Sequence, residues 1–315
     1  MVYENMRVLL TGGAGYIGSV MAESFLRAGW NVRVLDNLMY DQFGIADLCA
    51  FENFQFVYGD IRDLSLVREE LKSADVVVPL AGIVGAPACS RDEKLATEVN
   101  LVAPTQMFEM LSKDQLIIMP TTNSAYGTTI GLDECDETSP LNPISKYARD
   151  KVTLEERLMA LENAISFRLA TVFGASKRMR LDLLVNNFVH RSVKDGYLAI
   201  FEGHYVRNYI HIRDVVSAFE LAISRPNDFC GEIFNVGLST ANITKLELAN
   251  RIKEFLPSLV IMESAIGQDP DKRNYRVSNK KIEAKGFYPK FSLNHGIREL
   301  LAAMPFFRVS DFSNV

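Results

Sequence analysis

The chain has 315 residues, 48% of them apolar and 23% charged, and its formal net charge is −5. These values are typical of a folded globular protein and exclude wholesale disorder. The chain also lacks a run of basic residues of the kind that binds nucleic acids. The longest apolar stretch, Val76 to Ala88, is interrupted by prolines and glycines and is shorter than the ~20 residues of a membrane-spanning helix. We therefore expect a soluble cytoplasmic protein with neither a membrane nor a nucleic-acid partner.

Short β-branched segments alternate with longer segments of helical periodicity through the first half of the chain. Strands are expected at residues 7–10, 32–35, 54–57, 75–78, 115–119 and 164–169. Helices between them are expected at residues 16–28, 64–72, 92–112 and 144–161. Apolar strands separated by helices predict an α/β fold, a doubly wound parallel sheet of the Rossmann type, with ligands bound beyond the carboxyl ends of the strands.

The second half of the chain has a less regular pattern. A further core strand is expected at residues 232–236, preceded by a helix at 213–224. Helices of a smaller α/β lobe are expected at residues 181–194, 245–255 and 295–304. We therefore expect a Rossmann domain at residues 1–172 that also takes in about 208–240, while the remainder of 173–315 forms the second lobe.

A glycine-rich turn follows the first predicted strand, with glycines at positions 12, 15 and 18. Gly12 lets the chain turn sharply, Gly15 lets the backbone approach a pyrophosphate, and Gly18 lets the helix pack close to the sheet. The phosphates are then expected at the amides of the helix start, around Tyr16 and Ile17. A tight strand-to-helix turn without a ligand is the alternative.

Acidic residues end the second and third predicted strands. Asp36 lies 18 residues beyond Gly18, where a carboxylate accepts hydrogen bonds from an adenosine ribose and repels a 2′-phosphate. Asn37 follows it rather than an arginine, so NAD is favoured over NADP. Asp60, before Ile61, could face the adenine amine, and Asp63 is expected to cap the next helix.

Tyr147 and Lys151 are spaced i and i+4 on a predicted helix, so their side chains share one face. A free phenol has a pKa near 10, but an adjacent ammonium and an oxidised nicotinamide would favour the phenolate, which is a competent base. Thr122, at the end of the fifth strand, could bind the oxygen that becomes a carbonyl. By itself the YxxxK spacing is common by chance; the glycine turn in the same chain makes the catalytic reading the better one.

These motifs resemble the extended short-chain dehydrogenase/reductase family of nucleotide-sugar epimerases, dehydratases and dehydrogenases. The matching pieces, in the family's order over nearly the whole chain, are Gly12–Gly18, Asp36, Asp60–Ile61, Leu80–Ala81–Gly82, Asn100, Thr122, Tyr147 and Lys151. The resemblance implies that NAD is the cofactor and that Leu80, Ala81, Gly82, Asn100, Tyr147 and Lys151 contact it. It further implies that Thr122, Tyr147 and Lys151 carry the hydride chemistry, and that the protein is a homodimer.

The resemblance also implies that the substrate is a nucleotide-diphosphate sugar bound by the second lobe. Asn187 and Arg207 match the positions that bind the diphosphate, and Arg273 matches a second clamp. A guanidinium suits this role because it donates two parallel hydrogen bonds. The alternative is that these arginines are ordinary surface charges. Asn123, next to Thr122, is expected to face the sugar.

One departure from the family pattern bears on the reaction. The 4,6-dehydratases carry Asp-Glu directly after the catalytic threonine, whereas this chain has Asn123 and Ser124, which cannot act as acids or bases near neutral pH. Oxidation at a sugar C4 remains, followed by epimerisation or by product release, or else reduction of a 4-keto sugar. Four segments resemble a branch of the family that oxidises C4 of a GDP-activated heptose in bacterial capsule biosynthesis: 79–87, 122–127, 178–186 and 269–273.

Other classes of function have less support. The four histidines show no metal-ligand pairing and the four cysteines no CxxC, so neither a metal site nor a disulfide framework is expected. A non-catalytic NAD-binding redox sensor is disfavoured by the intact Thr122, Tyr147 and Lys151. A reductase of a small non-nucleotide carbonyl would leave Asn187 and both arginines without a role.

Overall fold

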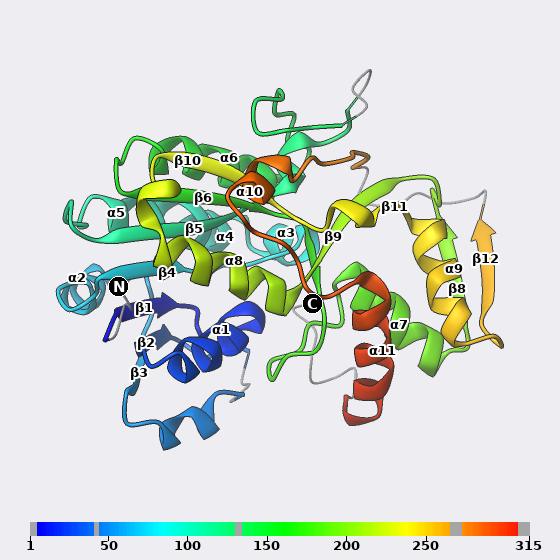
Figure 1. Cartoon of the computed structure of the whole chain (residues 1–315), viewed down its shortest axis with the longest axis horizontal. Coiled ribbons are helices and arrows are strands. Elements are labelled where there is room, and N and C mark those ends of the chain that lie inside the picture. Colours follow the sequence, from blue (N-terminus) through cyan, green and yellow to red (C-terminus); the bar gives the residue numbers. More distant parts are fainter. Residues whose placement is uncertain (1–4, 41–43, 130–133, 265–272, 308–315) are drawn as a thin grey trace.

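The computed structural model describes residues 5–40, 44–129, 134–264 and 273–307, and its centre is a seven-stranded sheet (Figure 1). The strand order is β10-β6-β5-β4-β1-β2-β3, and every neighbouring pair is parallel. The strands are β1 (Arg7–Thr11), β2 (Asn31–Asp36), β3 (Phe54–Tyr58), β4 (Val76–Pro79), β5 (Leu116–Thr122), β6 (Ala164–Leu169) and β10 (Glu232–Val236). The predicted doubly wound fold is confirmed, and the seven predicted strands are present with ends shifted by up to three residues.

Helices cover both faces of this sheet. On one face α1 (Tyr16–Arg27) packs beside α8 (Ile212–Ser224), and their apolar stripes join the largest core cluster. On the other face lie α2 (Leu64–Leu71), α5 (Ala103–Phe108) and α6 (Lys146–Leu158), which contact one another in that order. Burying both faces explains why the strands are almost continuously apolar.

The single helix predicted at residues 92–112 is wrong. The structure has α4 (Glu93–Thr97), a π-helical turn at Glu98–Val102 and then α5, and a short helix, α3 (Ala86–Arg91), precedes them. Pro104 has no N–H to donate to the carbonyl of Asn100, so the regular i to i−4 ladder is interrupted there. The wider turn coincides with the inward direction of the Asn100 side chain, which is buried.

The second lobe adds two small sheets, which the sequence pattern did not reveal (Figure 1, right). One has the order β11-β9-β7, with β7 (Thr171–Phe173), β9 (Val206–His211) and β11 (Asn242–Thr244). The other pairs β8 (Tyr197–Phe201) with β12 (Val260–Ser264). The helices of this part are α7 (Leu184–Lys194), α9 (Lys245–Phe255), α10 (Lys280–Ala284) and α11 (Leu293–Ala303). Short 3-10 helices lie at Ala46–Ala50, Asn123–Tyr126, Pro226–Asp228, Ser239–Ala241 and Met304–Phe306.

Within the described ranges, no helix is both long enough and apolar enough to cross a bilayer.

Candidate active site

A cavity of about 650 Å³ opens beyond the carboxyl ends of β1, β2, β4 and β5 and extends to β9 and α9 of the second lobe. It brings together nearly all of the predicted site residues, from both parts of the chain. Those that line it are Gly12, Gly15, Tyr16, Ile17, Gly18, Asp36, Asn37, Asp60, Ile61, Leu80, Ala81, Gly82, Thr122, Tyr147, Lys151, Asn187, Arg207 and Arg273. Asn100 and Asn123 are the two predicted residues outside this lining.

The glycine turn has the shape of a phosphate cradle. Gly12 adopts φ +69°, and a Cβ there would lie 2.4 Å from the backbone nitrogen of Ala81. Gly15 caps α1 without a capping side chain, and the first turn has no acidic residue, so its amides are available to an anion. An added Cβ on Gly18 would lie 2.5 Å from Gly13 Cα, so Gly18 packs against the turn itself rather than the sheet.

The side chain of Tyr16 lines the cavity and also makes two hydrogen bonds through its hydroxyl. Its hydroxyl donates to the Gly174 carbonyl at 2.7 Å and accepts from Asn186 Nδ2 at 3.1 Å. The start of α1 is thereby attached to the segment that leads into the second lobe.

Asp36 lies at the end of β2 with its carboxylate held by two backbone amides, those of Ala14 at 3.0 Å and Leu38 at 2.8 Å. Burial raises the pKa of Asp36, and these bonds and the charge of Arg178 oppose that rise. Arg178 is 3% exposed and lies over the ring of Tyr40, 4.5 Å from its centroid. The interaction of Arg178 with Asp36, 142 positions away, follows from no spacing rule and arises only in the folded chain.

Asp60 is tied to its own neighbours. It pairs with Arg62 at 2.9 Å and accepts a hydrogen bond from Asn37 at 3.0 Å, and Arg62 lowers the pKa of Asp60 to about 2. An adenine contact by Asp60 stays a prediction. Asp63 accepts from the amides of Ser65 and Leu66, which confirms it as the cap of α2.

Asn100 acts on the loop after β4 rather than on the cavity. Its side chain accepts from the Ile83 amide at 2.9 Å and donates to the Ile83 carbonyl at 2.8 Å. It is 1% exposed and lies outside the cavity lining, so its direct contact with NAD, expected from the resemblance, stays a prediction. Asn100 positions that loop.

Thr122, Tyr147 and Lys151 meet at one wall of the cavity, with Thr122 ending β5 and the other two on one face of α6. Ser145 caps α6 by accepting from the Ala148 amide at 3.2 Å. Lys151 is buried and donates to the Pro120 carbonyl at 3.3 Å, which anchors α6 to β5.

Burial dominates the electrostatics of this wall in the protein without cofactor. Burial raises the pKa of Tyr147 to about 12 and lowers the pKa of Lys151 to about 8. The cations that oppose the rise at Tyr147 are Arg180 and Arg273. The protein alone therefore does not acidify the phenol, because desolvation outweighs these charges.

Ser124 rather than Asn123 faces the cavity. Thr122 donates to Ser124 Oγ at 2.9 Å, and Ser124 Oγ also accepts a hydrogen bond from Arg273. Asn123 is 1% exposed and its amide makes no hydrogen bond. The expected contact of Asn123 with a sugar is thus not supported, since the 3-10 turn after β5 directs its side chain into the interior.

The second lobe supplies cations and an amide to the far part of the cavity. Asn187 Nδ2 donates to the Leu181 carbonyl at 3.1 Å. Arg207 is 2% exposed, lies 5.8 Å from the ring centroid of Tyr275 and donates to the carbonyl of Arg273. Arg178 and Arg180, two weaker candidates for the diphosphate from the segment 178–186, also line the cavity. Residues that line it and were not predicted to do so include Tyr40, Asp182, Lys245 and Tyr275.

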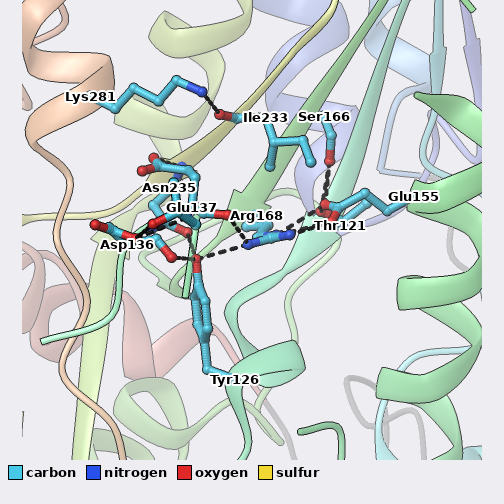
Figure 2. A network of polar contacts seen from close by, with 11 residues as sticks. Thr121, Tyr126, Asp136, Glu137, Glu155, Ser166, Arg168, Ile233, Asn235 and Lys281 are labelled. Carbon is cyan, nitrogen blue, oxygen red and sulfur yellow. Dashed lines mark hydrogen bonds and ion pairs between the residues drawn. The ribbon is translucent and has the colours of Figure 1, made fainter. Parts of the chain in front are cut away.

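A buried polar network supports the catalytic wall from behind (Figure 2). Glu155, one turn beyond Lys151 on α6, pairs with Arg168 at 2.6 Å and accepts from Thr121 at 2.9 Å. Arg168 also donates to the hydroxyl of Tyr126 at 3.0 Å. Because Thr121 precedes Thr122, these bonds fix the position of α6 relative to the end of β5.

Of the predicted segment 269–273, residues 269–272 lie outside the described residues. Among the residues that are described, no group of three or more histidine, cysteine, aspartate or glutamate side chains is placed to hold a metal ion.

The matching family model and the similar proteins agree with one another. Residues 8–237 match the NAD dependent epimerase/dehydratase family. A putative UDP-glucose 4-epimerase of Methanocaldococcus jannaschii is 27% identical over 93% of this chain and 97% of its own length. A dTDP-glucose 4,6-dehydratase of Streptomyces niveus is also 27% identical, over 93% and 91% of the two chains.

Solved structures agree with these sequences. The UDP-glucose 4-epimerase of Thermus thermophilus in complex with NAD superimposes with a TM-score of 0.82 at 26% identity, covering 95% of this chain and 99% of that one. The dTDP-glucose 4,6-dehydratase DesIV of Streptomyces venezuelae superimposes with a TM-score of 0.81 at 27% identity, covering 95% and 97%. The similarity thus extends over both lobes.

Proposed function

This chain belongs to the NAD-dependent epimerase/dehydratase family, and from that premise we propose that it oxidises a nucleotide-diphosphate sugar at its C4 hydroxyl with NAD as cofactor. The observation that carries the proposal is that one cavity contains the glycine turn, Thr122, Tyr147 and Lys151 together with the arginines of the second lobe. A cavity with the glycine turn, Thr122, Tyr147 and Lys151 but without the arginines would suit any dinucleotide enzyme.

The residues present fit NAD. The absence of a Cβ on Gly12 lets the turn pack against the backbone of Ala81, and the amides at the start of α1 have no capping side chain, which suits a pyrophosphate. Asp36 lines the same cavity and is proposed to bind the adenosine ribose. Leu80–Gly82, held by Asn100, form the adjacent wall. When bound, NAD supplies the acceptor for the hydride that leaves C4 of the sugar.

Tyr147 is proposed as the base that takes the proton of the C4 hydroxyl, and Thr122 as the hydroxyl that binds the same oxygen. Lowering the pKa of Tyr147 from about 12 to near neutrality requires about 7 kcal/mol of differential stabilisation of the phenolate. The charge of Arg180 already contributes to the value of about 12, so Lys151 and an oxidised nicotinamide are the cations that would supply it.

The fate of the sugar after oxidation at C4 is a separate part of the proposal. Asn123 and Ser124 offer no acid or base for dehydration, in contrast to the Asp-Glu pair typical of the dehydratases. We favour a GDP-heptose 4-dehydrogenase of capsule biosynthesis, on the resemblance of the segments named above. A 4-epimerase is the alternative, and the epimerases among the relatives support it. A 4-keto-sugar reductase has the same site requirements.

The alternative outside the enzymes is a non-catalytic NAD-dependent sensor. We also propose that the protein is a homodimer. The experiment that decides is mass spectrometry of ligands released from the denatured protein, followed by assay with GDP-, UDP-, CDP- and dTDP-sugars. Reduction of bound NAD by one of these sugars supports the enzyme. Binding of NAD without reduction by any sugar, and without reoxidation of NADH by a 4-keto sugar, favours the sensor.

A further inference from the structure

Lys245 is a buried cation in the wall of the cavity, and no sequence motif pointed to it. It is the first residue of α9 and is 3% exposed. Its ammonium donates to the carbonyl of Phe201 and lies 5.5 Å from the ring centroid of Tyr205. A cation at the positive end of a helix and out of water is costly for folding, so stability does not explain its position.

Lys245 lies at the end of the cavity that is distant from the catalytic wall. Arg273 is bonded to Ser124, beside Thr122, and Arg207 is bonded to the carbonyl of Arg273. Arg207 in turn lies on β9, paired with Ile243 of β11.

The chain continues from this pair toward Lys245. The backbone amide of Lys245 donates to the carbonyl of Tyr205, which directly precedes β9 and lies two residues, or roughly 7 Å of extended chain, before Arg207. A nucleotide sugar has its sugar, its diphosphate and its base in that same order.

Resting on the proposed function, we propose that Lys245 is a specificity-determining residue that binds the nucleobase and selects one with an exocyclic carbonyl oxygen, guanine O6 or pyrimidine O4. An ammonium only donates hydrogen bonds. Guanine O6 and the O4 of uracil or thymine accept there, whereas adenine and cytosine carry an amino donor at the corresponding position. Lys245 therefore favours GDP-, UDP- and dTDP-sugars over ADP- and CDP-sugars.

The test is a calorimetric titration of NAD-saturated protein with GDP, UDP, dTDP, ADP and CDP, because bound NAD keeps ADP out of the cofactor site. The wild type is expected to bind the first three more tightly. Lys245→Met should weaken their binding by about 10- to 100-fold, as for loss of a charged hydrogen bond, and change ADP and CDP by less than about twofold. Lys253→Met, an exposed lysine on the same helix, is the matched control and should change nothing.

Lys245→Arg keeps the donor and should keep the preference, so it carries the test if the methionine variant folds poorly. Equal weakening of all five nucleotides would overturn the proposal in favour of a phosphate or ribose contact, and so would an unchanged variant or a wild type without base preference. If no nucleoside diphosphate binds the NAD-saturated wild type, the proposed function itself fails, which separates the two cases.

Discussion

Arg273 donates a hydrogen bond to Ser124, although the two residues are 149 positions apart in the sequence. Ser124 Oγ is also the acceptor for the hydroxyl of Thr122, so the second lobe is connected directly to the catalytic wall. The side chain of Ser124 therefore connects Arg273, the predicted diphosphate clamp, with Thr122 at the predicted site of hydride chemistry.

Replacing Arg273 with methionine should weaken binding of the nucleotide sugar while NAD binding stays as in the wild type. A hydrogen bond to a charged group contributes about 1.5–3 kcal/mol, so KM for the sugar should rise about 10- to 100-fold. Steady-state kinetics and NAD titration measure the two effects. An unchanged KM would remove Arg273 from the clamp.

Replacing Asp36 with asparagine should relax the choice between NAD and NADP. The amides of Ala14 and Leu38 bind different oxygens of the Asp36 carboxylate, so Asn keeps an acceptor for one of them. Asn also loses the charge that repels a 2′-phosphate, while the cation of Arg178 remains nearby. The ratio of NAD to NADP affinity should fall about tenfold or more, since a nearby unit charge contributes on the order of 1–4 kcal/mol. Fluorescence titrations with both cofactors measure it, and a constant ratio would count against the ribose contact.

The buried ammonium of Lys151 makes the stability of the cofactor-free protein depend on pH. Its folded pKa of about 8 lies below the ordinary 10.5, so between these values the unfolded chain binds more protons and stability rises with pH. Lys151→Met removes this dependence. Its stability relative to the wild type should therefore drop by about 2 kcal/mol between pH 7 and pH 9.5.

Urea unfolding of both proteins at the two pH values, without NAD, checks the pH dependence. Parallel curves, with the same difference between the proteins at pH 7 and pH 9.5, would show that Lys151 is not desolvated as the structure has it.

Replacing Glu155 with glutamine should destabilise the fold, because it leaves the buried guanidinium of Arg168 unpaired. The pair is 4–5% exposed, and breaking such a pair by changing one partner costs about 3–5 kcal/mol. The double variant Glu155→Gln/Arg168→Met should recover part of the loss, since neither charge remains. Urea unfolding decides; a single variant within about 0.5 kcal/mol of the wild type contradicts the account of Figure 2.

The Rossmann sheet was predictable because its strands are buried on both faces and its motifs have fixed spacing. The helix around Asn100 was predicted as continuous although Pro104 interrupts its hydrogen-bond ladder. The bonds of Asn100 to Ile83, 17 positions away, follow from no spacing rule. The small sheets of the second lobe were missed because strands as short as Thr171–Phe173 carry too little periodicity.

The candidate site divides in the same way. Residues with a spacing rule, such as Gly12 and Asp36, were found, whereas Arg178 and Lys245 enter the cavity only through tertiary folding. The burial that raises the pKa of Tyr147 in the cofactor-free protein is likewise not visible in the sequence.

The central claim is that Tyr147 is the base, and a single-turnover measurement tests it most directly. Wild type and Tyr147→Phe are loaded with NAD and mixed with the nucleotide sugar identified from the panel, and the absorbance of NADH is followed. The phenyl ring keeps the packing but cannot take a proton, so we predict unchanged NAD and sugar binding with NADH formation slowed by at least about 100-fold. NADH formed by Tyr147→Phe at the wild-type rate would contradict the claim.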